Sequence, residues 1–205
     1  MVEATAEADR AAAAAAGREV AQRMSAAFAS MRDGTADPNE VREVIRTTRK
    51  PRRHIPVERV YDQVVPGTDG APDVPVRIYH PLIEGTPDPA LPLILYFHGG
   101  GFVLGDLDAT DACCRRLANG AGGIVISADY RLAPEHPFPA AVQDTWSVTC
   151  WAAEHGAELG GDPDRLVVSG DSAGANLAAV TAMVARDRGG PAIAFQVLIY
   201  PVVDQ

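Results

Sequence analysis

Residues 166–174 of this chain read Leu-Val-Val-Ser-Gly-Asp-Ser-Ala-Gly. The run from Leu166 to Ser169 predicts a strand that is buried on both faces, and the Ala-rich stretch that begins at Ala173 predicts a helix. The pentapeptide G-x-S-x-G joins them, so Ser172 lies at a strand-turn-helix junction, which is the setting of a nucleophile elbow. The stretch therefore predicts an α/β fold around this turn, with Ser172 as the candidate nucleophile.

The two glycines of the pentapeptide predict a close crossing of strand and helix. A Cβ at Gly170 or Gly174 would clash at that crossing. The turn also lifts the Ser172 hydroxyl clear of the sheet and points the positive end of the helix dipole at the charge that develops on a reacting carbonyl. The alternative is an ordinary tight turn in which the serine only caps the helix; the strand before it and the helix after it favour the nucleophile.

A glycine run supplies the second signal. His98-Gly99-Gly100-Gly101 follows the apolar run from Leu93 to Phe97 directly. Successive glycines leave backbone N–H groups unshielded, as an oxyanion hole requires. A phosphate-binding loop is the alternative, but the chain has neither G-x-G-x-x-G nor Gly-Lys-Ser/Thr here. We expect His98 to orient this loop rather than to act as a catalytic base.

Strand and helix patterns alternate along most of the chain. Val57–Val65 and Val74–Tyr79 are β-type runs around the turn sequence at 66–70, which predicts a hairpin. Beyond Pro92, alternating strands and helices predict a mostly parallel sheet with helices on both faces. The expected strands are Leu93–Phe97, Ile124–Ala128, Leu166–Ser169 and Phe195–Tyr200, all buried on both faces, and the expected helices cover about 108–119, 140–158 and 173–187.

The first 50 residues differ from the rest of the chain in composition and in the spacing of their apolar residues. Residues 1–32 are Ala-rich, and apolar side chains spaced by four, four and three positions predict a helix with a surface to cover. Asp37-Pro38 predicts the start of a second, short helix that ends before Pro51. We therefore divide the chain into a helical segment, residues 1–50, and an α/β part, residues 51–205. The apolar stripe of the first helix consists of Val20, Met24, Phe28 and Met31.

Composition and charge exclude several classes of protein. The chain has 205 residues, of which 47% are hydrophobic and 22% charged, as in ordinary globular domains. Its net charge of −9 argues against nucleic acid as a partner. Cys113, Cys114 and Cys150 form no C-x-x-C pair, which favours a reduced, cytoplasmic chain without disulfides. The Ala11–Ala16 run is too short for a signal peptide, and no apolar run is long enough to span a membrane.

A third motif, residues 129–135, reads Asp-Tyr-Arg-Leu-Ala-Pro-Glu, and we expect Asp129, Arg131 and Glu135 to pair and hold this loop. Together the motifs at 98–101, 129–135 and 170–174 resemble the bacterial hormone-sensitive lipase family of α/β-hydrolase carboxylesterases. The resemblance implies the α/β-hydrolase fold, a Ser-Asp-His esterase for small esters of short to medium acyl chains, no metal or organic cofactor, and an N-terminal helical cap at residues 1–50. It also implies Ser172 as nucleophile, an oxyanion hole from the N–H groups of Gly100, Gly101 and Ala173, and supporting roles for His98, Gly99, Gly170, Asp171 and Gly174.

The triad of this fold runs in the order Ser, Asp or Glu, His. After Ser172 the sequence contains Asp187, which is better explained as a solvated helix end, and Asp204, which is an alternative triad acid, but no histidine. We therefore expect an incomplete domain, the N-terminal two-thirds of a family member, that is inactive alone and prone to self-associate through the sheet edge at Phe195–Tyr200. The five histidines are His54, His80, His98, His136 and His155.

Two other functions remain open at this point. The missing histidine also fits a non-catalytic small-ligand-binding protein on the same scaffold, similar to the plant gibberellin receptors. Such a protein would need a complete pocket wall, as an enzyme does. Amidase chemistry is a further alternative within the enzyme class. Ester hydrolysis is the leading interpretation.

Overall fold

The computed structural model describes residues 2–49, 54–83, 85 and 90–203. Asp204, the alternative triad acid, and Pro51, the predicted stop of the second helix, lie outside these residues. The chain divides into two compact units, Met1–Lys50 and Pro51–Gln205. Each unit is described below by itself.

The first unit is a pair of helices, α1 (Val2–Arg32) and α2 (Pro38–Thr48), so both predicted helices are confirmed. The Asp37 side chain caps α2 by accepting a hydrogen bond from the Asn39 N–H at 2.7 Å, which leaves one fewer unpaired donor at the helix start. Three members of the expected α1 stripe, Met24, Phe28 and Met31, are half-buried. The side chain of Val20, the fourth member, lies outside the described part.

The second unit is built on a six-stranded sheet in the order β1-β2-β4-β3-β5-β6. The predicted hairpin is confirmed as the antiparallel pair β1 and β2, and β2 also pairs antiparallel with β4. The pairs β4–β3, β3–β5 and β5–β6 are all parallel, so the sheet is mixed but mostly parallel, as predicted. The strands are β1 (Arg59–Val65), β2 (Val74–His80), β3 (Leu91–Phe97), β4 (Ile124–Ala128), β5 (Gly161–Asp171) and β6 (Phe195–Ile199).

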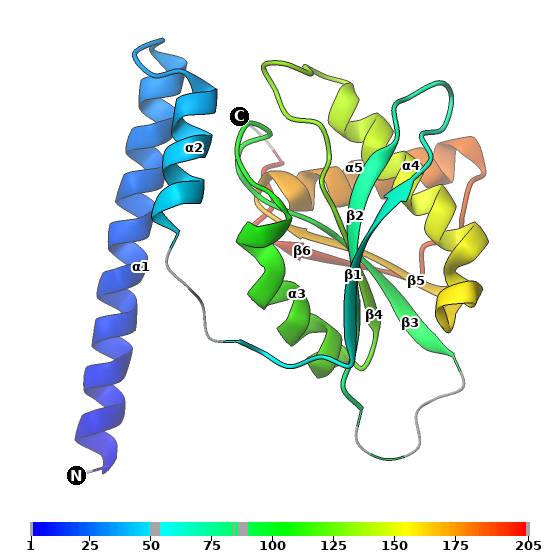
Figure 1. Cartoon of the computed structure of the whole chain (residues 1–205), viewed down its shortest axis with the longest axis horizontal. Coiled ribbons are helices and arrows are strands. Elements are labelled where there is room, and N and C mark those ends of the chain that lie inside the picture. Colours follow the sequence, from blue (N-terminus) through cyan, green and yellow to red (C-terminus); the bar gives the residue numbers. More distant parts are fainter. Residues whose placement is uncertain (1, 50–53, 84, 86–89, 204–205) are drawn as a thin grey trace. The chain divides into compact units, whose positions relative to one another are not determined.

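Helices cover both faces of this sheet (Figure 1). Leu93, Leu95 and Phe97 of β3 belong to the core beneath α4 and α5, whereas Ile94 and Tyr96 belong to the core beneath α3. Because successive side chains of a strand point to opposite faces, this double burial explains the uninterrupted apolar run of β3. The helices are α3 (Leu107–Ala121), α4 (Ala140–His155), continued by a 3-10 turn (Gly156–Leu159), and α5 (Ala173–Arg188).

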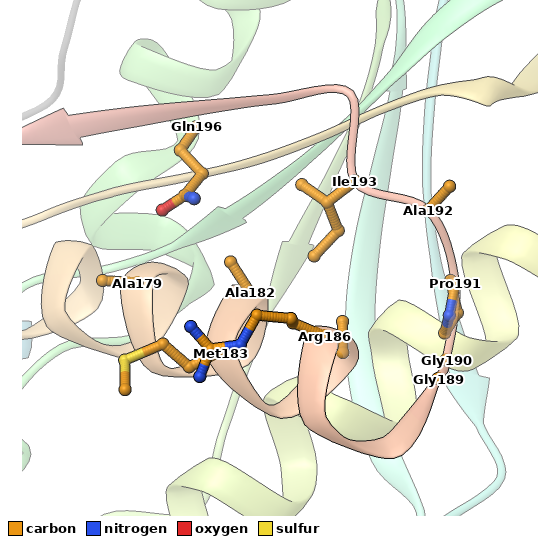
Figure 2. Close-up of a pocket in the computed structure, with 11 residues that line it drawn as sticks. Ala179, Ala182, Met183, Arg186, Gly189, Gly190, Pro191, Ala192, Ile193 and Gln196 are labelled. Carbon is orange, nitrogen blue, oxygen red and sulfur yellow. The ribbon is translucent and has the colours of Figure 1, made fainter.

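The strand β6 differs from the prediction. We expected it to be buried on both faces, but all five of its residues are exposed, with Phe195 at 64%. It lies at the edge of the described sheet, next to β5 alone. Side chains of α5 and Gln196 of β6 border a cavity of about 610 Å³ on this side of the unit (Figure 2). The apolar run therefore predicted the strand correctly, but the prediction that both faces of the strand are buried is wrong for the described sheet.

Candidate active site

Ser172 has a backbone conformation that L-residues rarely adopt, with φ 51° and ψ −117°. Such strained residues persist only where their surroundings hold them, and they cluster at functional sites. The Ser172 N–H donates to the Ile199 carbonyl at 2.9 Å, and its carbonyl accepts from the Asn176 N–H at 3.1 Å. The turn is thus held by β6 on one side and by the first turn of α5 on the other.

The glycines beside Ser172 are required by the close crossing of α5 over β3. A Cβ at Gly170 or at Gly174 would overlap the Phe97 carbonyl oxygen, and at Gly174 it would also meet the His98 carbonyl. Both obstacles are backbone atoms, so they cannot turn aside as a flexible side chain could. The predicted clash at Gly170 and Gly174 is confirmed.

The glycine loop after β3 turns sharply at Gly100 and Gly101, whose φ values are 133° and 62°. The Gly100 carbonyl accepts hydrogen bonds from Val103 at 3.1 Å and Leu104 at 2.8 Å. Within the described residues, no loop hydrogen bond is donated by the N–H of Gly100 or Gly101. At Ala173, the first residue of α5, the N–H has no intrahelical acceptor. Among the described residues, none of these three N–H groups donates a backbone hydrogen bond.

A carboxylate joins the serine turn to the glycine loop. Asp171 Oδ1 accepts hydrogen bonds from the Gly99 N–H at 3.0 Å and from the Tyr96 hydroxyl at 2.8 Å. Its other oxygen accepts from the Tyr200 hydroxyl at 3.4 Å. Burial, with the nearby Asp171 carboxylate, raises the pKa of Tyr96, so that hydroxyl keeps its proton and remains a donor. The residue before the serine therefore helps to place the loop that follows β3.

Removing this carboxylate is expected to loosen the link. In Asp171→Ala, Gly99 and Tyr96 lose a charged acceptor, and hydrogen bonds to charged groups contribute about 1.5–3 kcal/mol each. We expect the free energy of unfolding, measured by urea denaturation, to fall by about 3 kcal/mol, the lower end for two such bonds, because Asp171 is only half-buried. Asp171→Asn should retain most of it, because its oxygen still accepts. Asp187→Ala, at an exposed carboxylate paired with exposed Arg186, is the control; an equal loss there would contradict the assignment.

His98 is fully buried beneath the glycine loop. Its Nδ1 lies 2.9 Å from the Gly99 carbonyl, which makes Nδ1 the protonated nitrogen, and its ring stacks on Tyr130 at 4.2 Å. The Tyr130 hydroxyl donates to the His98 carbonyl at 2.6 Å. Burial lowers the pKa of His98, so the imidazole is neutral at pH 7. These contacts support the expected orienting role, and the sequence had not singled out Tyr130 as the second anchor.

The expected pairing within the 129–135 loop is wrong. Arg131 pairs with Asp144 of α4, at 2.7 Å from Nη2 to Oδ1, and its backbone N–H donates to Oδ2 of the same carboxylate at 2.7 Å. Among the described contacts it pairs with neither Asp129 nor Glu135. Burial, together with nearby Asp106, raises the pKa of Asp129 to about 6, so this carboxyl takes up a proton at a higher pH than an exposed aspartate does. A buried acid on the following helix, Asp144, holds the loop instead.

The structure does not bring a triad together from these residues. In the part of the chain that it describes, no histidine is hydrogen-bonded to Ser172. Asp187 forms an exposed ion pair with Arg186 at 2.7 Å, as expected for a solvated helix end. No group of three His, Cys, Asp or Glu side chains within the described ranges is placed to hold a metal ion. No helix among these residues has the length and apolar character needed to cross a membrane.

Comparison with known proteins matches this geometry to hydrolases. A family described as alpha/beta hydrolase fold matches residues 94–205. The esterase LipI of Mycobacterium tuberculosis is 54% identical over 153 residues, which cover 74% of this chain and 47% of LipI. The carboxylesterase NlhH of the same species is 49% identical over 167 residues, covering 81% of this chain and 51% of NlhH.

A solved structure shows the same relationship. The hyperthermophilic esterase from the archaeon Pyrobaculum calidifontis superposes with a TM-score of 0.70 at 45% identity, over 82% of this chain and 53% of the esterase. The chain therefore spans about half the length of the relatives it matches. The family match at residues 94–205 includes the serine turn and the glycine loop described above.

Proposed function

Because this chain belongs to the alpha/beta hydrolase fold family, we propose that it carries the nucleophile and the oxyanion-binding loop of a serine carboxylic-ester hydrolase. The observation that carries the proposal is the strained Ser172 turn, tied through Asp171 to the Gly99 N–H at 3.0 Å. An ordinary capping serine needs neither the strain nor this link. The hydrolase names of the relatives favour this function over ligand binding alone.

In the proposed reaction, Ser172 Oγ attacks the carbonyl carbon of a small ester of short to medium acyl chain. The carbonyl oxygen becomes an oxyanion, which accepts hydrogen bonds from the N–H groups of Gly100, Gly101 and Ala173. A histidine takes the Oγ proton and gives it to the leaving alcohol, and water then hydrolyses the acyl-enzyme. The proposal assigns this histidine and its acidic partner to residues outside 1–205, since no histidine follows Ser172. The steps require no metal or organic cofactor.

Covalent labelling tests the proposal. The protein used is a chimera, called here the extended chimera, in which residues 1–205 are followed by the segment of NlhH that comes after the shared region. We expect an alkyl fluorophosphonate to modify the extended chimera at Ser172, as mapped by mass spectrometry. An adduct on any other residue of 1–205, in a chimera whose circular dichroism shows a folded protein, would sink the assignment of the nucleophile.

We also propose two features that accompany this function. The helices of residues 1–50 serve as the cap of the hydrolase. Two observations support this role: the stripe at Met24, Phe28 and Met31 is half-buried, and the apolar side chain of Val44 in α2 is 59% exposed. The reaction takes place in the cytoplasm, a location supported by the free thiols of all three cysteines.

The 205-residue chain is expected to self-associate through β6. Within the described sheet the outer edge of β6 has no partner strand, and Phe195, Val197 and Leu198 are exposed by 64%, 38% and 37%. Unpaired apolar edges template pairing with a second chain. Size-exclusion chromatography with light scattering should give species above the monomer mass of 21.6 kDa, and Val197→Lys should shift them toward it. Phe138→Lys, at an apolar side chain away from the edge, is the control; a monodisperse monomeric chain would contradict the prediction.

A further inference from the structure

The chain segment that follows β6 holds the serine turn from both sides. The Ser172 N–H donates to the Ile199 carbonyl at 2.9 Å, and the Ser172 carbonyl accepts from the Val202 N–H at 3.4 Å. Between these two contacts the chain bends at Tyr200, whose φ of 39° lies in the left-handed region. Both backbone groups of Ser172 are therefore engaged by one short segment, residues 199–202, that comes much later in the sequence.

The Asn176 side chain fastens this segment to α5. Its Nδ2 donates to the Val202 carbonyl at 2.7 Å, across 26 positions of sequence. Among the described residues, this is the one side-chain hydrogen bond between α5 and the segment after β6. The contact between the Val202 N–H and the Ser172 carbonyl is longer than the usual range of about 2.7–3.2 Å. The Asn176 amide is therefore the stronger of the two bonds that keep Val202 beside the turn.

The orientation of the Ser172 carbonyl matters because this group shares a peptide plane with the Ala173 N–H. A trans peptide is planar, so its C=O and N–H point in opposite directions and turn together. Two donors converge on the Ser172 carbonyl, the backbone N–H groups of Asn176 at 3.1 Å and of Val202 at 3.4 Å. These donors therefore fix the direction of the Ala173 N–H, which is one of the three proposed oxyanion donors.

The serine turn needs support from outside because its own backbone is strained. Residues with a conformation like that of Ser172, φ 51° and ψ −117°, persist only where the surrounding structure over-determines them. Within the described residues, the Ser172 hydroxyl makes no capping hydrogen bond to α5, so it does not restrain the turn itself. The contacts from residues 199–202, secured by Asn176, supply that restraint.

We propose that Asn176 is a positioning residue for the reaction at Ser172. Its side-chain amide holds the segment after β6 against the serine turn, and the held segment keeps the Ser172 hydroxyl and the Ala173 N–H in the geometry that the reaction needs. The inference rests on the proposed function and adds a residue that acts through Val202 without contacting the reacting atoms.

Hydrogen exchange tests whether the amide holds the segment. Asn176→Asp keeps the size of the side chain but replaces the donor with an oxygen that repels the Val202 carbonyl. In the 205-residue chain, peptides that span residues 170–176 should exchange about tenfold faster or more in this variant, as measured by mass spectrometry, because the turn opens locally. Peptides from β4 should exchange at an unchanged rate.

Kinetics of the extended chimera test whether the held turn serves catalysis. Asn176→Asp should lower kcat for p-nitrophenyl butyrate about tenfold or more, since a misplacement of about 1 Å can cost roughly 10²-fold. KM should change by less than about twofold, as expected when an interaction specific to the transition state is weakened. The rate of Ser172 labelling by the alkyl fluorophosphonate should fall in parallel.

Asn119 provides a matched control. Its side-chain amide also donates to a backbone carbonyl, that of Pro56 at 2.8 Å, and its Oδ1 accepts from the Leu82 N–H at 2.8 Å. Asn119→Asp therefore makes the same chemical change away from the serine turn, and kcat should stay within about twofold. Circular dichroism checks that each variant is folded. If Asn176→Asp does not fold, Asn176→Ala, which removes the donor without adding a charge, is measured in the same way.

Three results would overturn the inference: unchanged exchange at residues 170–176, a loss confined to KM, which would mean that Asn176 contacts the substrate instead, or an equal loss of kcat in Asn119→Asp. Failure of the proposed function gives a different result. The extended chimera with Asn176 intact would then not be labelled at Ser172, whereas the exchange measurement does not depend on catalysis and still tests the contact with Val202.

Discussion

Ser172→Ala is expected to lower kcat/KM of the extended chimera for p-nitrophenyl butyrate by about 10⁶-fold, the order of loss seen when a serine triad loses its nucleophile. The strained turn places this one hydroxyl directly before α5, and Asp171 ties the turn to the glycine loop through the Gly99 N–H. No step after the attack can proceed without it, so KM effects should be minor beside the loss of kcat. Initial rates of p-nitrophenol release, measured over a range of substrate concentrations, give kcat and KM separately.

Two comparisons make this result specific. Ser127→Ala removes a hydroxyl that is fully buried in β4 and should leave kcat/KM of the extended chimera within a few-fold. The 205-residue chain alone should hydrolyse this ester far more slowly than the extended chimera, because a triad without its histidine retains only about 10³ to 10⁴ of rate over water. Saturable hydrolysis by that chain, abolished by Ser172→Ala, would show that one of its five histidines acts as the base.

Asp144→Ala is expected to destabilise the second unit by about 3–5 kcal/mol, as is typical when one partner of a buried ion pair is removed. Asp144 is 1% exposed and the Arg131 side chain is 22% exposed, so the guanidinium would be left largely desolvated without its counter-charge. The backbone N–H of Arg131 would lose its acceptor as well. Urea denaturation of the 205-residue chain measures the loss.

A double variant distinguishes charge burial from simple loss of packing. Arg131→Met with Asp144→Leu removes both charges and keeps apolar volume, so it should recover much of the stability that Asp144→Ala loses. If Asp144→Ala costs less than about 1 kcal/mol, the pair behaves as a solvated surface pair, and its proposed role in holding the 129–135 loop is wrong.

The residue pattern was enough to predict most elements of the fold. Uninterrupted apolar runs identified β3, β4 and β5, because these strands are buried on both faces. The turn sequence at 66–70 identified the hairpin, and Asp37-Pro38 identified the start of α2. These signals are local, since each depends on residues within one element or its immediate flanks. Burial of β6 could not be read in the same way, because an apolar strand has the same sequence at a covered position and at an exposed edge.

The same distinction applies to the candidate site, where some features could be identified from sequence and others only from the structure. Ser172, its flanking glycines and the glycine loop could be identified from sequence, because a tight crossing and an unshielded backbone each require glycine at defined positions. The contacts that assemble them could not. Asp171 and Gly99 are 72 positions apart, and Asp171 and Tyr96 are 75 apart. A tyrosine within an apolar strand gives no sign of its hydroxyl's partner.

The sequence by itself therefore determined which residues form the strands, the helices and the strained serine turn, because propensity, periodicity and glycine sterics act over a few neighbouring residues. Tertiary structure alone decided that Asp144 rather than Asp129 or Glu135 pairs with Arg131, and that Asp171 and Tyr130 hold the glycine loop. Those outcomes depend on which elements the parallel sheet brings side by side. That arrangement is set by the packing of the whole core, which no single segment encodes.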